Sequence, residues 1–386
     1  MGARARRLVT IVGTIGLPGL LALGVAAAPS AEIAGGSHLG LPASSVILAS
    51  TAKINLGRKL FMDRRLSPNR TMSCGMCHIP EQGFTSNQTN TAVGLAGRHL
   101  RRNAPTLLNV GYQQSLFHDG RESSLERQVW SPLLAPDEMG NGSAAELVAR
   151  IALLADYREP LAAAFPDQPV GQDAVAGALA AYERSLVSAR SRFDRWRYGG
   201  DNDALDASER QGFELFMGKA GCAACHVVGD REALFTDRRY HNTGIGWERA
   251  NRPPDRYTVP LAPGISTQIP ASALSTLLGA SLKDDGRFEV TGRPQDRWAY
   301  KTPSLRNVAL TAPYMHDGSL PTLTAVVEFY SAGGADNPTR DPVLRPLGLS
   351  SQDKHALEAF LLTLTGDNVK QLATEARLAF RSDGSY

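Results

Sequence analysis

The sequence predicts a mainly helical protein built from two related domains. Apolar residues recur at helical spacing in several segments, for example at Val175, Leu179, Tyr182 and Leu186. No run of alternating β-branched residues indicates a substantial sheet. A length of 386 residues suits two domains of ordinary size better than one.

The composition indicates an exported globular chain. With 42% hydrophobic residues the chain can bury proper cores, and a net charge of +3 gives no indication of nucleic-acid binding. Three arginines near the start precede an apolar run over about 8–28, followed by small residues, which is the pattern of a signal peptide over 1–30. The run is long enough to be an uncleaved membrane anchor instead. Its glycines and proline favour the signal peptide, and with it a periplasmic location.

All four cysteines belong to two Cys-x-x-Cys-His motifs, whose defining members are Cys74, Cys77, His78, Cys222, Cys225 and His226. Two thiols one helical turn apart add to the vinyl groups of a haem, and the histidine that follows binds the iron. Zinc held by two Cys-x-x-Cys pairs is the alternative. However, 145 positions separate the pairs, and zinc explains neither histidine. The sequence therefore predicts two covalent c-type haems.

The surroundings of the two motifs repeat each other. A G-x-x-L-F segment precedes each motif, and a Phe-Thr pair follows it. Residues 105–110 read PTLLNV and residues 303–308 read PSLRNV. In both copies a His-Asp-Gly triplet begins nine residues after the asparagine, at His118 and His316. One supersecondary unit therefore occurs twice, which predicts two cytochrome-c-like helical domains with one covalent haem each.

We expect an N-terminal haem domain over 31–199 and a C-terminal haem domain over 200–386. Glycines and polar residues within 190–205 indicate a linker. Helices within 144–188 are assigned to the first haem unit.

Two local features are also predicted. Ser208 and Gln211 have the spacing of a capping box before the second haem helix. The stretch 251–270, rich in glycine and proline, is expected to form a long loop.

The two copies differ at one corresponding position. Fourteen residues after His316 stands Tyr330, whereas fourteen residues after His118 stands Pro132. A phenolate can bind ferric iron, but proline has no side-chain donor. If this position faces the iron, the second haem is capped by protein and the first is open to small ligands.

Two polar residues near Pro132 are candidate catalytic groups. A carboxylate at Glu138 could take a proton from bound peroxide and return it to the leaving oxygen. Gln128 could hold the peroxide by a hydrogen bond. On spacing alone, a glutamate at such a position is more often a solvated surface residue.

Taken together, the motifs resemble the bacterial di-haem cytochrome c peroxidase and MauG family. The resemblance runs from about Leu56 to about Leu364, over segments such as CGMCH, RRNAPTLLNV, FHDGRESSLERQ, CAACH and KTPSLRNVALTAPYMHDG. It implies a peroxidatic N-terminal haem with Glu138 as the distal acid–base residue and Gln128 beside it. It also implies an electron-relaying C-terminal haem with Tyr330 as distal ligand, a MauG-like feature where ordinary peroxidases carry Met.

The resemblance further implies a calcium ion, bound by the Asn103 side chain and the backbone carbonyls of Thr311 and Pro313. A turn cap is the alternative role for Asn103. The implied partners are hydrogen peroxide and either a small redox protein, a cytochrome c or a cupredoxin, or an oxidisable partner protein. A homodimer is compatible with the resemblance.

Three positions depart from the family pattern. His118 stands where the family often has a tryptophan between the haems, so either His118 relays electrons differently or electrons tunnel through other groups. Ala220 stands where MauG has a surface tryptophan, which weakens a role in oxidising a quinone-cofactor precursor protein. His99 is the candidate for the histidine that caps the resting first haem in many members, with a solvated loop residue as the alternative.

Three functions follow from these observations. The first is a peroxidase, and the second is a MauG-like oxidase that modifies residues of a partner protein. The third is a non-catalytic di-haem electron carrier. An open haem beside Glu138 argues against the carrier, because a carrier gains nothing from an exposed reactive iron.

Overall fold

The computed structural model describes most of the chain, namely residues 38–43, 49–252, 255–262, 265–270, 272–273 and 283–381. The signal peptide predicted over 1–30 lies outside these residues. Within the described ranges, none of the helices has the length and apolar character needed to cross a membrane.

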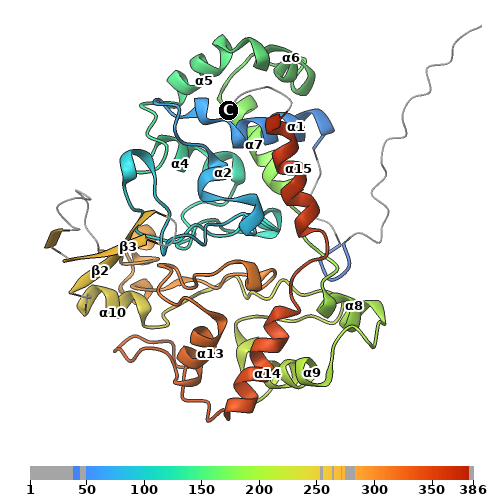
Figure 1. The fold of residues 1–386 in the computed structure, drawn as a ribbon, viewed down its shortest axis with the longest axis vertical. Helices are drawn as coiled ribbons and strands as arrows, with labels where there is room; N and C mark the ends of the chain where they lie inside the picture. Colours follow the sequence, from blue (N-terminus) through green and yellow to red (C-terminus); the bar gives the residue numbers. More distant parts are fainter. Residues whose placement is uncertain are drawn as a thin grey trace, which may run out of the picture. The chain divides into compact units, whose positions relative to one another are not determined.

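Helices dominate the described structure, which confirms the mainly helical prediction (Figure 1). The longer helices are α1 (Thr51–Met62), α5 (Ala144–Leu153), α6 (Ala155–Ala164), α7 (Gln172–Ser185), α8 (Arg192–Gly199), α9 (Ala207–Met217), α13 (Leu323–Ser331), α14 (Ser351–Leu362) and α15 (Val369–Arg381). The shorter helices are α2 (Cys74–Cys77), α3 (Leu125–Gln128), α4 (Trp130–Leu134), α10 (Ile245–Asn251) and α12 (Phe288–Thr291).

Two small antiparallel sheets complete the described fold. Strand β1 (Tyr240–His241) pairs with β4 (Tyr300–Lys301), and β2 (Arg256–Ala262) pairs with β3 (Ile265–Pro270). The long loop predicted over 251–270 is therefore wrong. Both strands carry β-branched or aromatic residues that favour extended backbone, and this preference outweighs the glycine and prolines nearby.

The first hydrophobic core forms where α1 crosses α7. Gly57 packs so closely that a Cβ added there would lie 1.9 Å from the carbonyl oxygen of Ala178. One turn later, Tyr182 meets the ring of Phe61 edge-on at 5.2 Å between ring centres. Helices α5 and α6 contribute Leu147, Ile151 and other buried residues to the same core. The glycine is needed because any side chain would force the two helices apart.

The second core repeats this crossing with α9 and α14. A Cβ added to Gly212 would lie 1.9 Å from the carbonyl oxygen of Ala356, and 2.8 Å from the Cβ of Phe360. Phe360 stacks edge-on against Phe216 at 5.1 Å between ring centres. The same glycine contact thus builds both helix pairs.

The repeated unit extends further than the sequence motifs indicated. The backbone N–H of Asn109 donates to the carbonyl of Leu186 (2.8 Å), and that of Asn307 donates to the carbonyl of Leu364 (3.0 Å). Both asparagines have left-handed backbone, with φ of 61° and 62°. Each asparagine therefore joins the loop after its motif to the end of a helix pair, so α7 is the counterpart of α14.

Two helices depart from a simple division of the chain. Helix α8, inside the linker predicted over 190–205, packs Phe193 and Trp196 into the second core. Helix α15, near the end of the chain, packs Val369 and Ala376 into the first core beside α1 (Figure 1). Each core is thus completed by a helix from beyond its own copy of the repeat.

The capping box predicted at Ser208 and Gln211 is wrong. It lies two residues earlier, at Asp206 and Glu209, where each side chain accepts a hydrogen bond from the other residue's backbone N–H (both 2.9 Å). Aspartate caps as well as serine does, so the register was ambiguous in sequence.

Candidate active site

One cavity touches both Cys-x-x-Cys-His motifs. It has a volume of about 1200 Å³, and its wall includes Cys77 and His78 from the first motif and Cys222, Cys225 and His226 from the second. Helix α2, which carries the first motif, and α9, which leads into the second, lie in opposite halves of the view in Figure 1. The cavity therefore connects the two halves of the repeat.

The two histidines are held alike. His78 Nδ1 lies 3.1 Å from the carbonyl oxygen of Phe84, and His226 Nδ1 lies 2.9 Å from that of Phe235. Because a carbonyl only accepts, Nδ1 carries the proton in both rings and Nε2 is left with its lone pair. Burial lowers the pKa of both histidines, so both stay neutral at pH 7. A neutral imidazole with Nδ1 fixed by a carbonyl is the form that binds a metal.

The thiols also suit covalent attachment. Each motif closes one turn, with the N–H of the histidine donating to the carbonyl of the first cysteine (2.9 Å in both). All four cysteines are free thiols rather than disulfides. Each motif pairs two thiols with a metal-ready imidazole, and both motifs reach one cavity through Cys77, His78, Cys222, Cys225 and His226, so the residues present fit two covalently attached haems.

The candidate catalytic residues lie on the wall of the same cavity. Gln128 ends α3, Pro132 lies within α4, and Glu138 follows in the turn after α4. A small loop holds this turn in place. The N–H of Leu95 donates to the carbonyl of Glu138 (2.8 Å), and a Cβ added to Gly94 would lie 1.9 Å from the carbonyl oxygen of Asp137.

Glu138 is set up to exchange protons near neutral pH. Burial, with a smaller contribution from the neighbouring Asp137 carboxylate and against the opposing effect of Arg121, raises the pKa of Glu138 to about 7. The Glu138 carboxylate also contributes, after burial, to raising the pKa of the Cys77 thiol to about 12. A proton-exchanging carboxyl group therefore lies within electrostatic range of the first motif.

Tyr330 lies on the cavity wall near the second motif. It is the penultimate residue of α13. Burial raises the pKa of its phenol, and the nearby Cys225 and Cys222 raise it further. Helices α3 and α13 both begin after a hydroxyl N-cap, Ser124 and Thr322, so the two copies match here in structure as well.

The residues of the predicted calcium site converge on the cavity. Asn103, Thr311 and Pro313 all line it. The Asn103 amide nitrogen donates to the carbonyl of Pro313 (3.2 Å) and to that of Asn90 (3.0 Å). In this arrangement the side chain offers Pro313 a donor, whereas calcium needs its oxygen. The calcium site stays a prediction.

The positions that depart from the family pattern are also located. His118 lines the cavity, and its Nε2 lies 3.0 Å from the carbonyl oxygen of Asn103. Ala220 is buried, with 6% of its surface exposed, so this position cannot present a side chain to a partner. His99 is not among the described residues of the cavity wall, and its backbone instead pairs with Val93.

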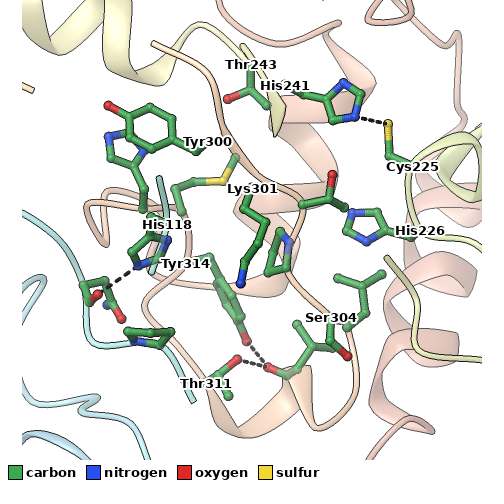
Figure 2. A pocket seen from close by; sticks show the side chains of 18 of the residues that line it. His118, Cys225, His226, His241, Thr243, Tyr300, Lys301, Ser304, Thr311 and Tyr314 are labelled. Atoms are coloured by element: carbon green, nitrogen blue, oxygen red, sulfur yellow. Dashed lines mark hydrogen bonds between the residues drawn. The ribbon is translucent and has the colours of Figure 1, made fainter. Parts of the chain in front are cut away.

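Tyr300 and Lys301, which the sequence analysis did not single out, also line the cavity (Figure 2). Tyr300 stacks on the ring of His316 at 3.6 Å between ring centres, with 12° between the planes. Lys301, the next residue, extends its ammonium into the space between His118 and His226. Lys301 and His316 stand in the KTPSLRNVALTAPYMHDG segment, but nothing local in the sequence shows that they meet in a cavity.

Comparison with known proteins agrees with this geometry. Residues 51–203 match the family described as di-haem cytochrome c peroxidase. The chain is 36% identical over 316 residues to the methylamine utilization protein MauG of Methylorubrum extorquens, covering 82% of this chain and 78% of that one. It is 32% identical over 330 residues to the cytochrome c551 peroxidase of Nitrosomonas europaea, covering 84% of each.

A solved structure is also similar. The crystal structure of a MauG-like protein associated with microbial copper homeostasis superimposes with a TM-score of 0.67 at 34% identity, covering 83% of this chain and 91% of that one. A helical fold with two haem attachment motifs on one cavity defines a di-haem c-type cytochrome. The chain belongs to the di-haem cytochrome c peroxidase family, whose members are oxidoreductases with two haems.

Proposed function

We propose that this chain is a periplasmic peroxidase that reduces hydrogen peroxide at its N-terminal haem. The observation that carries this proposal is the placement of Glu138. Glu138 lies on the wall of the cavity that the first motif also lines, and its pKa is raised to about 7. Pro132, on the same wall, has no side-chain group that could bind an iron. The C-terminal haem is proposed to relay or store oxidising equivalents. Electrons would come from a small redox protein, a cytochrome c or a cupredoxin.

Each residue near the first motif has a defined part. Cys74, Cys77 and His78 would hold the haem, which would supply the iron redox chemistry that cleaves the oxygen–oxygen bond of hydrogen peroxide. The Glu138 carboxylate takes the proton from the near oxygen and returns it to the far oxygen, which then leaves as water. The Gln128 amide holds the far oxygen by donating a hydrogen bond.

Tyr330 is proposed as the distal ligand of the second haem. Its position on the cavity wall beside Cys222 and Cys225 supports this role. An oxyanionic ligand favours the oxidised iron more than a thioether does. A capped haem of this kind suits electron transfer and storage rather than peroxide binding.

A second candidate function is oxidation of a partner protein in the manner of MauG. The identity to MauG and the presence of Tyr330 favour it. The buried Ala220 argues against electron entry at the position where MauG has its surface tryptophan. Peroxide chemistry at the first haem is common to both functions, and they differ in the electron donor.

Three further details belong to the proposal. Each hydrophobic core holds one haem, within domains over 31–199 and 200–386, with α8 and α15 crossing between them. A signal peptide over 1–30 directs export. One calcium ion binds at Asn103, Thr311 and Pro313, supported by the convergence of these residues on the cavity wall.

Glu138→Gln tests the catalytic role directly. We expect peroxide turnover to fall by roughly 10²–10⁴-fold, because the amide cannot accept and return the proton. Haem content, measured from the pyridine haemochrome spectrum, should stay at two per chain. Glu159→Gln, at an exposed position on α6, should turn over peroxide like the wild type. Unchanged turnover in Glu138→Gln rejects Glu138 as the acid–base group.

A further inference from the structure

Lys301 occupies a central place in the cavity (Figure 2). It ends β4, and its backbone N–H donates to the carbonyl of His118 (2.8 Å). Its ammonium donates to the carbonyl of Ser115 (2.6 Å). The side chain comes from the second copy of the repeat, whereas both acceptors come from the first. Lys301 is therefore fixed where the two halves meet.

The Lys301 ammonium has no carboxylate partner among the described residues. It has three N–H donors, of which Ser115 takes one. Among the residues that the structure describes, no carboxylate lies within 4.0 Å of Lys301 Nζ. Asp119 acts on it at longer range and is already paired with Arg102 (2.6 Å) and Arg121 (3.0 Å). A buried cation of this kind is costly unless an anion accompanies it.

The other cations of the cavity wall do not share this situation. Four of the other five lysine and arginine side chains on the described wall have a carboxylate within ion-pair distance, namely Arg101, Arg102, Arg121 and Lys219. The fifth, Arg345, is exposed to solvent. Lys301 therefore differs from the other cations of the described cavity wall. Its side chain extends into the cavity, and no carboxylate of the described residues lies within ion-pair distance of it.

We propose that Lys301 binds a propionate carboxylate of a haem, an inference that rests on the two haems of the proposed function. The propionates of a haem stand across the macrocycle from the vinyl groups that the thiols attack. Because Cys77, Cys222 and Cys225 line the cavity, a haem attached at either motif would extend from the wall into the interior, where Lys301 lies. The remaining two N–H donors of the ammonium suit a carboxylate.

This contact would set the reduction potential of the haem that it touches. A positive charge beside a propionate offsets the negative charge that otherwise favours the oxidised iron. Removing the ammonium therefore makes reduction less favourable. The two haems offer the same carboxylate chemistry, so the experiment must follow both.

The test compares Lys301→Met with Lys301→Arg in the full-length protein with both haems attached. The midpoint potential of each haem is measured by spectroelectrochemical titration. We expect Lys301→Met to lower the reduction equilibrium constant of at least one haem by about tenfold, which is 59 mV for one electron. Lys301→Arg, which keeps the charge, should stay closer to the wild type.

The pattern of shifts identifies the ligand. A shift confined to the first or the second haem names the source of the propionate, and a shift in both means that the ammonium is shared. Unchanged potentials of both haems in Lys301→Met overturn the inference. If that variant loses haem, Lys301→Gln, which keeps a donor for Ser115 without the charge, gives the same comparison.

Failure of this inference differs from failure of the proposed function. Wild-type protein that holds two haems but does not turn over peroxide overturns the proposed function and leaves the Lys301 contact standing. Full peroxide turnover with unchanged potentials in Lys301→Met overturns the Lys301 contact alone.

Discussion

At the scale of single residues, burial decides which carboxyl group can do chemistry. Glutamate in solution is ionised well below neutral pH, whereas Glu138 has its pKa raised to about 7 because the cavity disfavours its charge. The loop around Gly94 and Leu95 fixes the backbone of this turn, so the carboxyl group has a defined place beside the first motif.

The pH dependence of turnover follows from this shift. The ionised form of Glu138 is the base, and a raised pKa means that this form is lost as pH falls through about 7. We expect kcat/KM for peroxide to fall about tenfold for each pH unit below that point. The measurement is a pH profile between 5 and 9. The residual activity of Glu138→Gln should show no inflection near 7, and a wild-type profile that stays level across this pH range would contradict the assignment.

At the scale of elements, a glycine in each half of the molecule lets two helices pack in direct backbone contact. Gly57 lets α1 touch the backbone of α7, and Gly212 lets α9 touch that of α14 in the same way. Because each pair supports the loop that carries a haem motif, the crossing sets where the histidine lies. Close packing of this kind tolerates little added volume.

Gly57→Ala tests this packing. The added methyl group would meet the carbonyl of Ala178, so we expect a loss of about 1–3 kcal/mol in the free energy of unfolding. Gly177→Ala is the matched control on α7, because a Cβ there meets nothing closer than 3.5 Å, and alanine favours a helix by up to about 1 kcal/mol. Urea unfolding of the haem-loaded protein measures both. Equal stability of the two variants would show that the crossing is not tight.

At the scale of the whole molecule, two similar units differ in what faces the cavity. Pro132 in the first and Tyr330 in the second both line it, although only tyrosine can bind iron. Under the proposed function, this one changed side chain distinguishes an open first haem from a capped second haem. The ion pair of Arg102 with Asp284 joins the two units beside this cavity, and Arg102 also pairs with Asp119 of its own unit.

Electron paramagnetic resonance of the ferric protein tests this asymmetry. We expect one high-spin and one low-spin haem, because the proposed function gives only the second haem a protein ligand on both faces. Tyr330→Met should make the second haem easier to reduce, whereas Tyr314→Phe, which removes a different phenol of the cavity wall, should leave both signals unchanged. Two low-spin signals in the wild type would mean that a protein side chain also caps the first haem, and His99 would be the candidate. An unaltered spectrum in Tyr330→Met would mean that Tyr330 is not the ligand.

The sequence by itself determined the features that depend on short spacing. A Cys-x-x-Cys-His motif works within one helical turn, and the repeats PTLLNV and PSLRNV with their following triplets are visible without any fold. The helical periodicity of α7 and the family resemblance were readable for the same reason. Two local predictions were wrong because the sequence allowed more than one structure. The loop expected over 251–270 contains the hairpin of β2 and β3, and the capping box expected at Ser208 begins at Asp206.

Only the tertiary structure decided the features that depend on residues far apart in the chain. The equivalence of α7 and α14 rests on a glycine touching a distant backbone, and the elevated pKa of Glu138 rests on what surrounds it. In the sequence Lys301 is an ordinary charged residue, but in the fold it extends into the cavity shared by the two motifs, and no carboxylate of the described residues lies within ion-pair distance of it. Burial and charge pairing are sums over neighbours in space, and sequence order alone does not give those neighbours.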